Sequence, residues 1–144
     1  MSKQQLILGL NEDLAAELGT IIRYNYQAAK AFGMVGVGLR EMFRSELQDE
    51  LLHAAFLADV IVDLGGEPTT TPKEFAKPEE LKAMLELDLE MELHDVENYR
   101  RRAEQADAIG KVELKLKLEE MAADEAGHAR ELRRLLKGVP FATK

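Results

Sequence analysis

Apolar side chains recur at spacings of three and four along most of the chain, and alternating runs rich in β-branched residues are missing. This is the period of an α-helix, so the pattern predicts four helices. We expect them at about residues 3–32, 37–64, 78–107 and 111–137. The inward stripe predicted for the first helix is Ile7, Leu10, Leu14, Glu17, Ile21, Tyr24 and Ala28.

Glycine and proline interrupt the pattern between the helices. The interrupting residues are Gly33, Gly36 and Gly38, then Gly65, Gly66 and Pro68, then Gly110, and finally Gly138 and Pro140. Residues 65–77 form the only long connection. Two short turns with one long link between them predict an all-α four-helix bundle of two antiparallel hairpins joined by a crossover. At 144 residues, we expect a single domain over residues 1–144.

Two Glu-x-x-His pairs stand out, each with a further glutamate 33 residues before its own Glu. The second set follows the first by 75 positions at all three members, as if one helical hairpin had been duplicated. Three-residue spacing puts Glu and His on one face of a helix. The two sets are Glu17, Glu50 and His53, and Glu92, Glu125 and His128.

All four glutamates occupy inward positions where leucine or isoleucine is expected. A single glutamate in a sequence this rich in acid is usually a solvated surface residue, but six residues in register on inward stripes argue against that interpretation. Four buried carboxylates would repel one another. No Lys or Arg is expected on the inward stripes near them, whereas two divalent cations would balance the charge. Oxygen and imidazole ligands suit Fe(II), Mn(II) or Zn(II).

Composition narrows the class of protein. The absence of cysteine excludes disulfides and thiolate metal sites. The net charge of −8 argues against nucleic acid as a partner and favours cations. The apolar run near the start of the chain is too short for a signal peptide or a membrane span. We therefore expect a cytoplasmic protein with no membrane partner.

Several stretches resemble the bacterioferritin branch of the ferritin-like superfamily, over about residues 5–137. They are LNEDLAAELGTIIRYNYQA, LQDELLHA, LELDLEMELHDVENYR and DEAGHA. The resemblance implies a ferritin-like bundle that binds two irons per subunit, oxidises Fe(II) with O₂ or H₂O₂ and stores ferric mineral in a shell. It implies that Glu50 and Glu125 bridge both metals, that Glu17 and His53 complete one coordination sphere, and that Glu92 and His128 complete the other.

The resemblance also bears on residues around these six. Tyr24 lies two turns beyond Glu17, where a family tyrosine forms a hydrogen bond near the metals, although an ordinary core aromatic is the alternative. Tyr99 is its counterpart in the second half, and we interpret it as a packing residue. His94 is expected to be exposed. Asp49 and Asp124 each precede a bridging glutamate and are either cavity residues or solvated acids.

Two departures from the bacterioferritin pattern affect cofactor and assembly. The residue after the first bridging glutamate is Leu51, where bacterioferritins carry the haem-ligating methionine, so no haem is expected. The tail after His128 is too short for the fifth helix that helps to close a 24-subunit shell. We therefore expect a homo-oligomer built from dimers, with a dimer, a 12-mer or a 24-mer as the alternatives.

Ferroxidase activity with iron storage is the leading interpretation. An alternative is a di-metal oxidase or peroxidase without storage that resembles rubrerythrin or manganese catalase, although the chain lacks the cysteines of a rubrerythrin iron domain. A DNA-protecting miniferritin is a third alternative, which the acidic charge disfavours.

Overall fold

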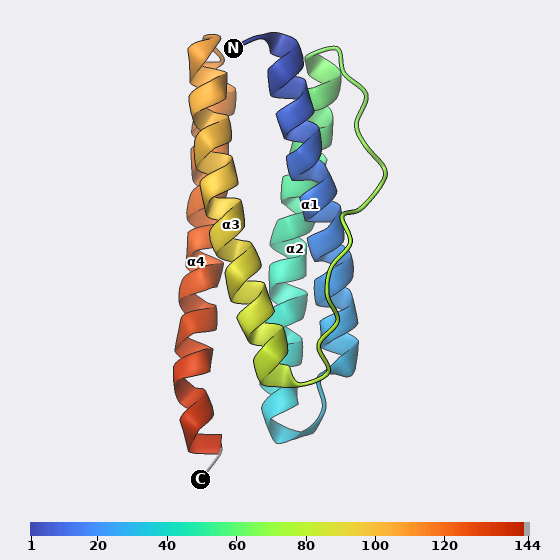
Figure 1. Cartoon of the computed structure of the whole chain (residues 1–144), viewed down its shortest axis with the longest axis vertical. Helices are drawn as coiled ribbons and strands as arrows, with labels where there is room; N and C mark the ends of the chain where they lie inside the picture. Colours follow the sequence, from blue (N-terminus) through green and yellow to red (C-terminus); the bar gives the residue numbers. More distant parts are fainter. Residues whose placement is uncertain (143–144) are drawn as a thin grey trace. The chain divides into compact units, whose positions relative to one another are not determined.

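The computed structural model describes residues 1–142, with side chains described through Lys137. Its helices are α1 (Lys3–Lys30), α2 (Gly33–Asp63), α3 (Leu81–Ala108) and α4 (Val112–Ala142), coloured along the chain in Figure 1. The chain divides into two compact units, Met1–Phe75 with α1 and α2, and Ala76–Lys144 with α3 and α4. Each unit is a helical hairpin, as the sequence predicted. The single-domain organisation over residues 1–144 stays a prediction.

The first hairpin begins with a capping box, in which the Ser2 hydroxyl accepts a hydrogen bond from the Gln5 backbone N–H while the Gln5 side chain accepts one from Ser2. These two bonds satisfy donors that a helix start leaves open. The interior of the hairpin contains fully buried apolar and aromatic side chains, among them Leu6, Leu10, Tyr24, Phe43, Leu57 and Ile61. Burial of these stripes holds α1 against α2.

The turn between α1 and α2 is shorter than predicted. We expected Gly36 and Gly38 to lie in a loop, but α2 begins at Gly33, which adopts a positive φ of 76°. The correction has a steric basis at Gly36, where an added Cβ would lie 2.7 Å from the Ala31 carbonyl carbon. Glycine at position 36 therefore allows the backbone of Ala31 to lie close to the start of α2, and it does not break the helix.

The segment after α2 runs back along α1 (Figure 1). Gly65 has a φ of 90° and its neighbour Gly66 donates a backbone hydrogen bond to Ile61, so the helix ends where predicted. Asn11 then donates to the Glu67 carbonyl and accepts from the Thr69 N–H, at 3.0 and 2.8 Å. These contacts fix the crossover segment on the surface of α1.

Further along the same segment, the Lys73 N–H donates to the Ala15 carbonyl at 2.9 Å. The Lys73 carbonyl oxygen would lie only 2.5 Å from a Cβ added at Gly19. The chain can approach α1 this closely because residue 19 has no side chain. In this way residues 64–75 belong structurally to the first hairpin.

The second hairpin turns at Gly110, which has a φ of 74°. Lys111 and Gly110 donate backbone hydrogen bonds to Ala106 and Asp107, an arrangement that closes the end of α3. The fourth helix extends beyond its predicted end. Gly138 and Pro140 do not terminate α4, which continues to Ala142.

The inward stripe predicted for the first helix is confirmed at the residues that are buried, which are Leu10, Leu14, Glu17, Tyr24 and Ala28. Ile7 and Ile21 are only half-buried. Among the described residues, no helix combines the length and the apolar character that crossing a membrane requires.

Candidate metal centre

The first hairpin brings one glutamate of α1 next to a glutamate and a histidine of α2. Glu17, Glu50 and His53 are 1%, 0% and 5% exposed. Each offers a ligand atom within 4.8 Å of those of the other two. The Nδ1 atom of His53 lies 3.9 Å from Oε2 of Glu17. The three predicted residues of the first set therefore converge in the hairpin interior.

The second hairpin repeats this arrangement with residues of α3 and α4. Glu92 and Glu125 are fully buried and His128 is 8% exposed. Their ligand atoms also lie within 4.8 Å of one another. The Nδ1 atom of His128 is 3.7 Å from Oε1 of Glu92 and 3.6 Å from Oε1 of Glu125. The 75-residue repeat in the sequence therefore corresponds to the same group of two glutamates and one histidine in each hairpin.

The donor atoms and their separations fit metal ions. Separations of 3.6–3.9 Å are too long for hydrogen bonds. Two ligand atoms held about 2.1 Å from one ion, and about 120° apart around it, are about 3.6 Å from each other. Each hairpin offers two carboxylates and one imidazole, a set of oxygen and nitrogen donors suited to iron, manganese or zinc. Each hairpin thus carries its own buried Glu/His donor set suited to a metal ion.

The remaining candidate residues divide by burial. Tyr24 is fully buried and stacks on Phe43, with ring centroids 5.8 Å apart, and the Arg23 guanidinium lies 5.1 Å from the centroid of its ring. Tyr99 is also buried, at 2% exposure. His94 is exposed, as predicted, and Asp49 and Asp124 are exposed as well.

Sequence reasoning missed several buried charged residues. Arg23 and Arg102 are 1% and 7% exposed. They lie six positions from Glu17 and ten positions from Glu92, so the expectation that no Lys or Arg lies on the inward stripes near the glutamates stays a prediction. Asp13 and Asp88 are 3% and 0% exposed, and each lies one helical turn before the first glutamate of its hairpin. These two aspartates are themselves 75 positions apart (88 − 13 = 75), so the 75-residue repeat could have identified them as a matching pair.

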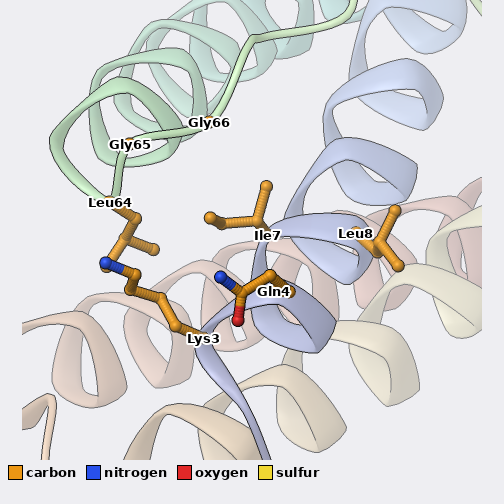
Figure 2. A pocket seen from close by; sticks show the side chains of 7 residues that line it. All are labelled: Lys3, Gln4, Ile7, Leu8, Leu64, Gly65 and Gly66. Carbon is orange, nitrogen blue, oxygen red and sulfur yellow. The ribbon is translucent and has the colours of Figure 1, made fainter.

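A surface pocket of about 440 Å³ lies elsewhere in the first hairpin, between the start of α1 and the end of α2. Its lining comes from Lys3, Gln4, Ile7 and Leu8 of α1 and from residues 64–66 (Figure 2). Lys3 and Glu17 are fourteen positions apart on α1, or about 21 Å along the helix. The pocket is therefore separate from the Glu/His group.

Solved structures support the fold and the donor set. A ferritin-like, diiron-carboxylate protein from Bacillus anthracis str. Ames superposes with a TM-score of 0.92, at 45% identity, over 94% of this chain and 99% of that one. The bacterioferritin of Rhodobacter capsulatus, described with a metal-free dinuclear site and haem iron, superposes with a TM-score of 0.78, at 25% identity, over 95% and 86%. The predicted fold, a ferritin-like four-helix bundle of two hairpins, is confirmed.

Sequence comparisons agree with the structural ones. The bacterioferritin of Brucella melitensis biotype 1 is 30% identical over 129 residues, which cover 86% of this chain and 78% of that protein. Residues 7–141 match the ferritin family, described as a ferritin-like domain. A match over this much of the chain means that this protein belongs to the ferritin family.

Proposed function

We propose that this protein is a ferroxidase that oxidises Fe(II) and stores or detoxifies the ferric product within a homo-oligomeric shell. The observation that carries the proposal is the repeated group of two buried glutamates and one histidine in each hairpin. The similarity of this chain to a diiron-carboxylate protein and to a bacterioferritin supports iron as the metal.

The six residues would divide the binding of two Fe(II) ions between the hairpins. Glu17 and His53 would bind one ion and Glu92 and His128 the other. Glu50 and Glu125 would supply the carboxylates shared by both. With four carboxylates against two divalent cations the formal charges cancel, which removes the repulsion that four buried acids otherwise feel. Hard anionic oxygens would also stabilise the higher charge of Fe(III) after oxidation.

The chemistry requires two electrons, one from each Fe(II). With O₂ as oxidant, two Fe(II), one O₂ and two protons give two Fe(III) and one H₂O₂. With H₂O₂ as oxidant, two Fe(II), one H₂O₂ and two protons give two Fe(III) and two H₂O. The protein's part is to hold the two ions at one site and to exclude bulk water from the buried carboxylates. Tyr24, which is buried in the same hairpin as Glu17, would place a hydroxyl near the reacting ions.

Aerobic oxidation of Fe(II) by purified protein tests the proposal, followed through the ultraviolet absorbance of Fe(III). Glu50→Ala and Glu125→Ala should each abolish the fast phase and reduce metal content below the two ions per chain expected of the parent protein. Asp49→Ala and Asp124→Ala are matched controls, because each alters the exposed acid directly before the tested glutamate. Parent oxidation rates in either glutamate variant would contradict the proposal.

Assembly and storage need a separate measurement. Light scattering distinguishes twelve chains of 16.2 kDa (12 × 16.2 ≈ 194 kDa) from twenty-four (24 × 16.2 ≈ 389 kDa). Growth of a ferric mineral after repeated additions of Fe(II) supports storage. Consumption of H₂O₂ without mineral growth, in a dimer, would instead favour the rubrerythrin-like or manganese-catalase-like activity.

A further inference from the structure

Large apolar side chains are exposed at the turn between α1 and α2, at one end of the first hairpin (Figure 1). Phe32, Met34, Val35 and Val37 are 73%, 97%, 63% and 63% exposed, and we call residues 32–37 the apolar turn. Apart from its chain neighbours and its own helix backbone, no described atom lies within 4 Å of a Cβ added at Gly33, so the turn projects into open space. Apolar groups gathered this closely on a surface mark a site that another molecule covers.

The turn of the second hairpin shows that the fold does not require this apolar surface. Gly33 and Gly110 have nearly the same positive φ, 76° and 74°. The four residues after Gly33 read MVGV, whereas the four after Gly110 read KVEL. The valine common to both has the same exposure, 63% for Val35 and 64% for Val112. A helical hairpin can therefore turn with charged residues in water, and the apolar turn serves a role specific to the first hairpin.

The charge around the apolar turn is opposite in sign to that of the whole chain. The protein has 27 acidic residues and a net charge of −8, yet residues 18–45 contain one acid, Glu41. Lys30, Arg40 and Arg44 are exposed on the two sides of the turn. None of these three basic residues forms an ion pair with a residue that the structure describes. Their positive charge is available for an anionic partner.

The acidic remainder of the hairpin lies too far away to cancel this charge. After Glu41, the next exposed acid of α2 is Asp49, about 24 Å from Gly33 along the helix, which is about three times the screening length at physiological salt. Lys73 and Glu74 of the crossover segment offset each other. The start of α2 also has no side-chain cap and no acid in its first turn, so the positive end of the helix dipole adds to the charge of the turn.

We propose that the apolar turn binds the surface of an anionic lipid bilayer, with Phe32, Met34 and Val35 inserted among the acyl chains and with Lys30 and Arg40 at the phosphate groups. Membrane surfaces take up exposed apolar side chains and attract the Lys and Arg residues beside them. The expectation of no membrane partner was based on the lack of a spanning segment, and binding to a surface requires none.

Other partners fit the apolar turn less well. Two copies of the chain that met turn to turn would bring Lys30 and Arg40 against the same residues of the other copy, and like charges in contact are unfavourable. A protein partner would need a concave apolar site shaped to a projecting group, since Met34 is 97% exposed. A bilayer surface accepts such a group without a shaped pocket, because acyl chains rearrange around it.

Flotation of the purified protein with lipid vesicles tests the proposal. Phosphatidylcholine vesicles with about 30% phosphatidylglycerol should bind the protein at least about tenfold more strongly than phosphatidylcholine alone. This binding should weaken at least about fivefold between about 0.05 and about 0.5 M NaCl, because salt screens the attraction of the basic residues. No binding to the anionic vesicles, or equal binding to both compositions, would overturn the proposal.

The two turns supply a matched pair of substitutions, because Val35 and Val112 each lie two residues after the glycine of their turn and are equally exposed. Val35→Asp should lower the affinity for anionic vesicles at least about tenfold, since it places a negative charge in the inserted group. Val112→Asp should leave the affinity within about twofold of the parent value. Helical content and metal bound per chain report the folding of both variants. Equal affinities of the two variants would contradict the proposal.

Charge reversal tests the contribution of the basic residues. Lys30→Glu/Arg40→Glu should lower the affinity for anionic vesicles at least about tenfold. Arg101→Glu/Lys111→Glu is the control, because it makes the same change in net charge at exposed residues flanking the second turn, and it should stay within about threefold of the parent affinity. The proposal fails if the two double variants bind equally well.

Insertion is measured separately with a polarity-sensitive fluorescent label, since the parent chain has no cysteine. A label attached through Met34→Cys should shift to shorter wavelength on anionic vesicles, and a label attached through Val112→Cys should not. Flotation without a shift at position 34 would mean that another surface binds the lipid, and the proposal would be wrong. These measurements are independent of the ferroxidase assignment, because the apolar turn contains none of the six Glu and His residues.

Discussion

Oε2 of Glu17 and Nδ1 of His53 lie 3.9 Å apart, although the two residues belong to different helices of the first hairpin. Glu92 and His128 repeat the relation in the second hairpin at 3.7 Å. Each hairpin therefore carries its own part of the proposed site, and the two parts can be tested one at a time.

Replacing one histidine should affect one metal position more than the other. We expect His53→Ala and His128→Ala each to reduce the stoichiometry from about two ions per chain to about one, because the remaining hairpin keeps its two glutamates and its imidazole. Calorimetric titration with a redox-inert divalent ion measures the stoichiometry without interference from oxidation. His94→Ala is the control, since His94 is exposed. Loss of both ions in either single variant would show that the two positions bind metal as one unit.

Removing the buried charges should stabilise the metal-free protein. Glu50 and Glu125 are fully buried, and replacing buried ionic groups with apolar residues of similar volume is often stabilising by about 1–4 kcal/mol. We expect Glu50→Leu/Glu125→Leu to raise the free energy of unfolding in a chelator by an amount in this range. The same variant should lose the stabilisation by metal, which for the parent protein is about 2.7 kcal/mol at a metal concentration one hundred times the Kd.

Urea denaturation with and without Co(II) or Zn(II) checks both parts, at one fixed protein concentration. A double variant that is less stable than the parent protein without metal would mean that the glutamates stabilise the fold by themselves. A metal-dependent gain that persists in the variant would place the binding site elsewhere.

Helix positions and the six buried Glu and His residues could be predicted from the sequence because both depend on short-range periodicity. Hydrophobic spacing places a residue on the inner or outer side of a helix, and Glu17 and Glu92 lie on the inner side with their apolar neighbours. The 75-residue offset then identified which polar residues belong together.

Features that depend on contacts between distant segments could not be predicted in this way. Residue 36 lacks a side chain because an added Cβ would lie 2.7 Å from the Ala31 carbonyl carbon, and Gly19 is needed because residue 73 crosses it. Neither contact leaves a periodic signal. Arg23 was missed because an arginine is normally assigned to the surface, whereas here its guanidinium is buried beside the ring of Tyr24.

Tyr24 and Tyr99 occupy equivalent positions in the two hairpins and should differ in function. We expect Tyr24→Phe to slow Fe(II) oxidation about tenfold with little change in metal content, the effect of losing one hydrogen bond worth about 1.4 kcal/mol. Tyr99→Phe, which makes the same change in the second hairpin, should leave the rate within about twofold. Stopped-flow absorbance measures both. If Tyr24→Phe also left the rate within about twofold, Tyr24 would contribute through packing alone, and an equal tenfold loss in Tyr99→Phe would show that the two hydroxyls do not differ in function.

The crossover segment depends on the missing side chain at Gly19. Gly19→Ala should lower the free energy of unfolding by about 1–3 kcal/mol, because the new methyl group would lie 2.5 Å from the Lys73 carbonyl oxygen and backbone would have to move. Gly38→Ala is the opposite case, since Gly38 is an exposed helical residue with no atom within 4 Å of an added Cβ. That change should stabilise the protein by about 0.5–1 kcal/mol through higher helix propensity. Urea denaturation of both variants in a chelator gives the comparison, and proteolysis within residues 67–75 should accelerate only in Gly19→Ala. If both substitutions are stabilising, the crossover segment is not fixed to α1 at this point.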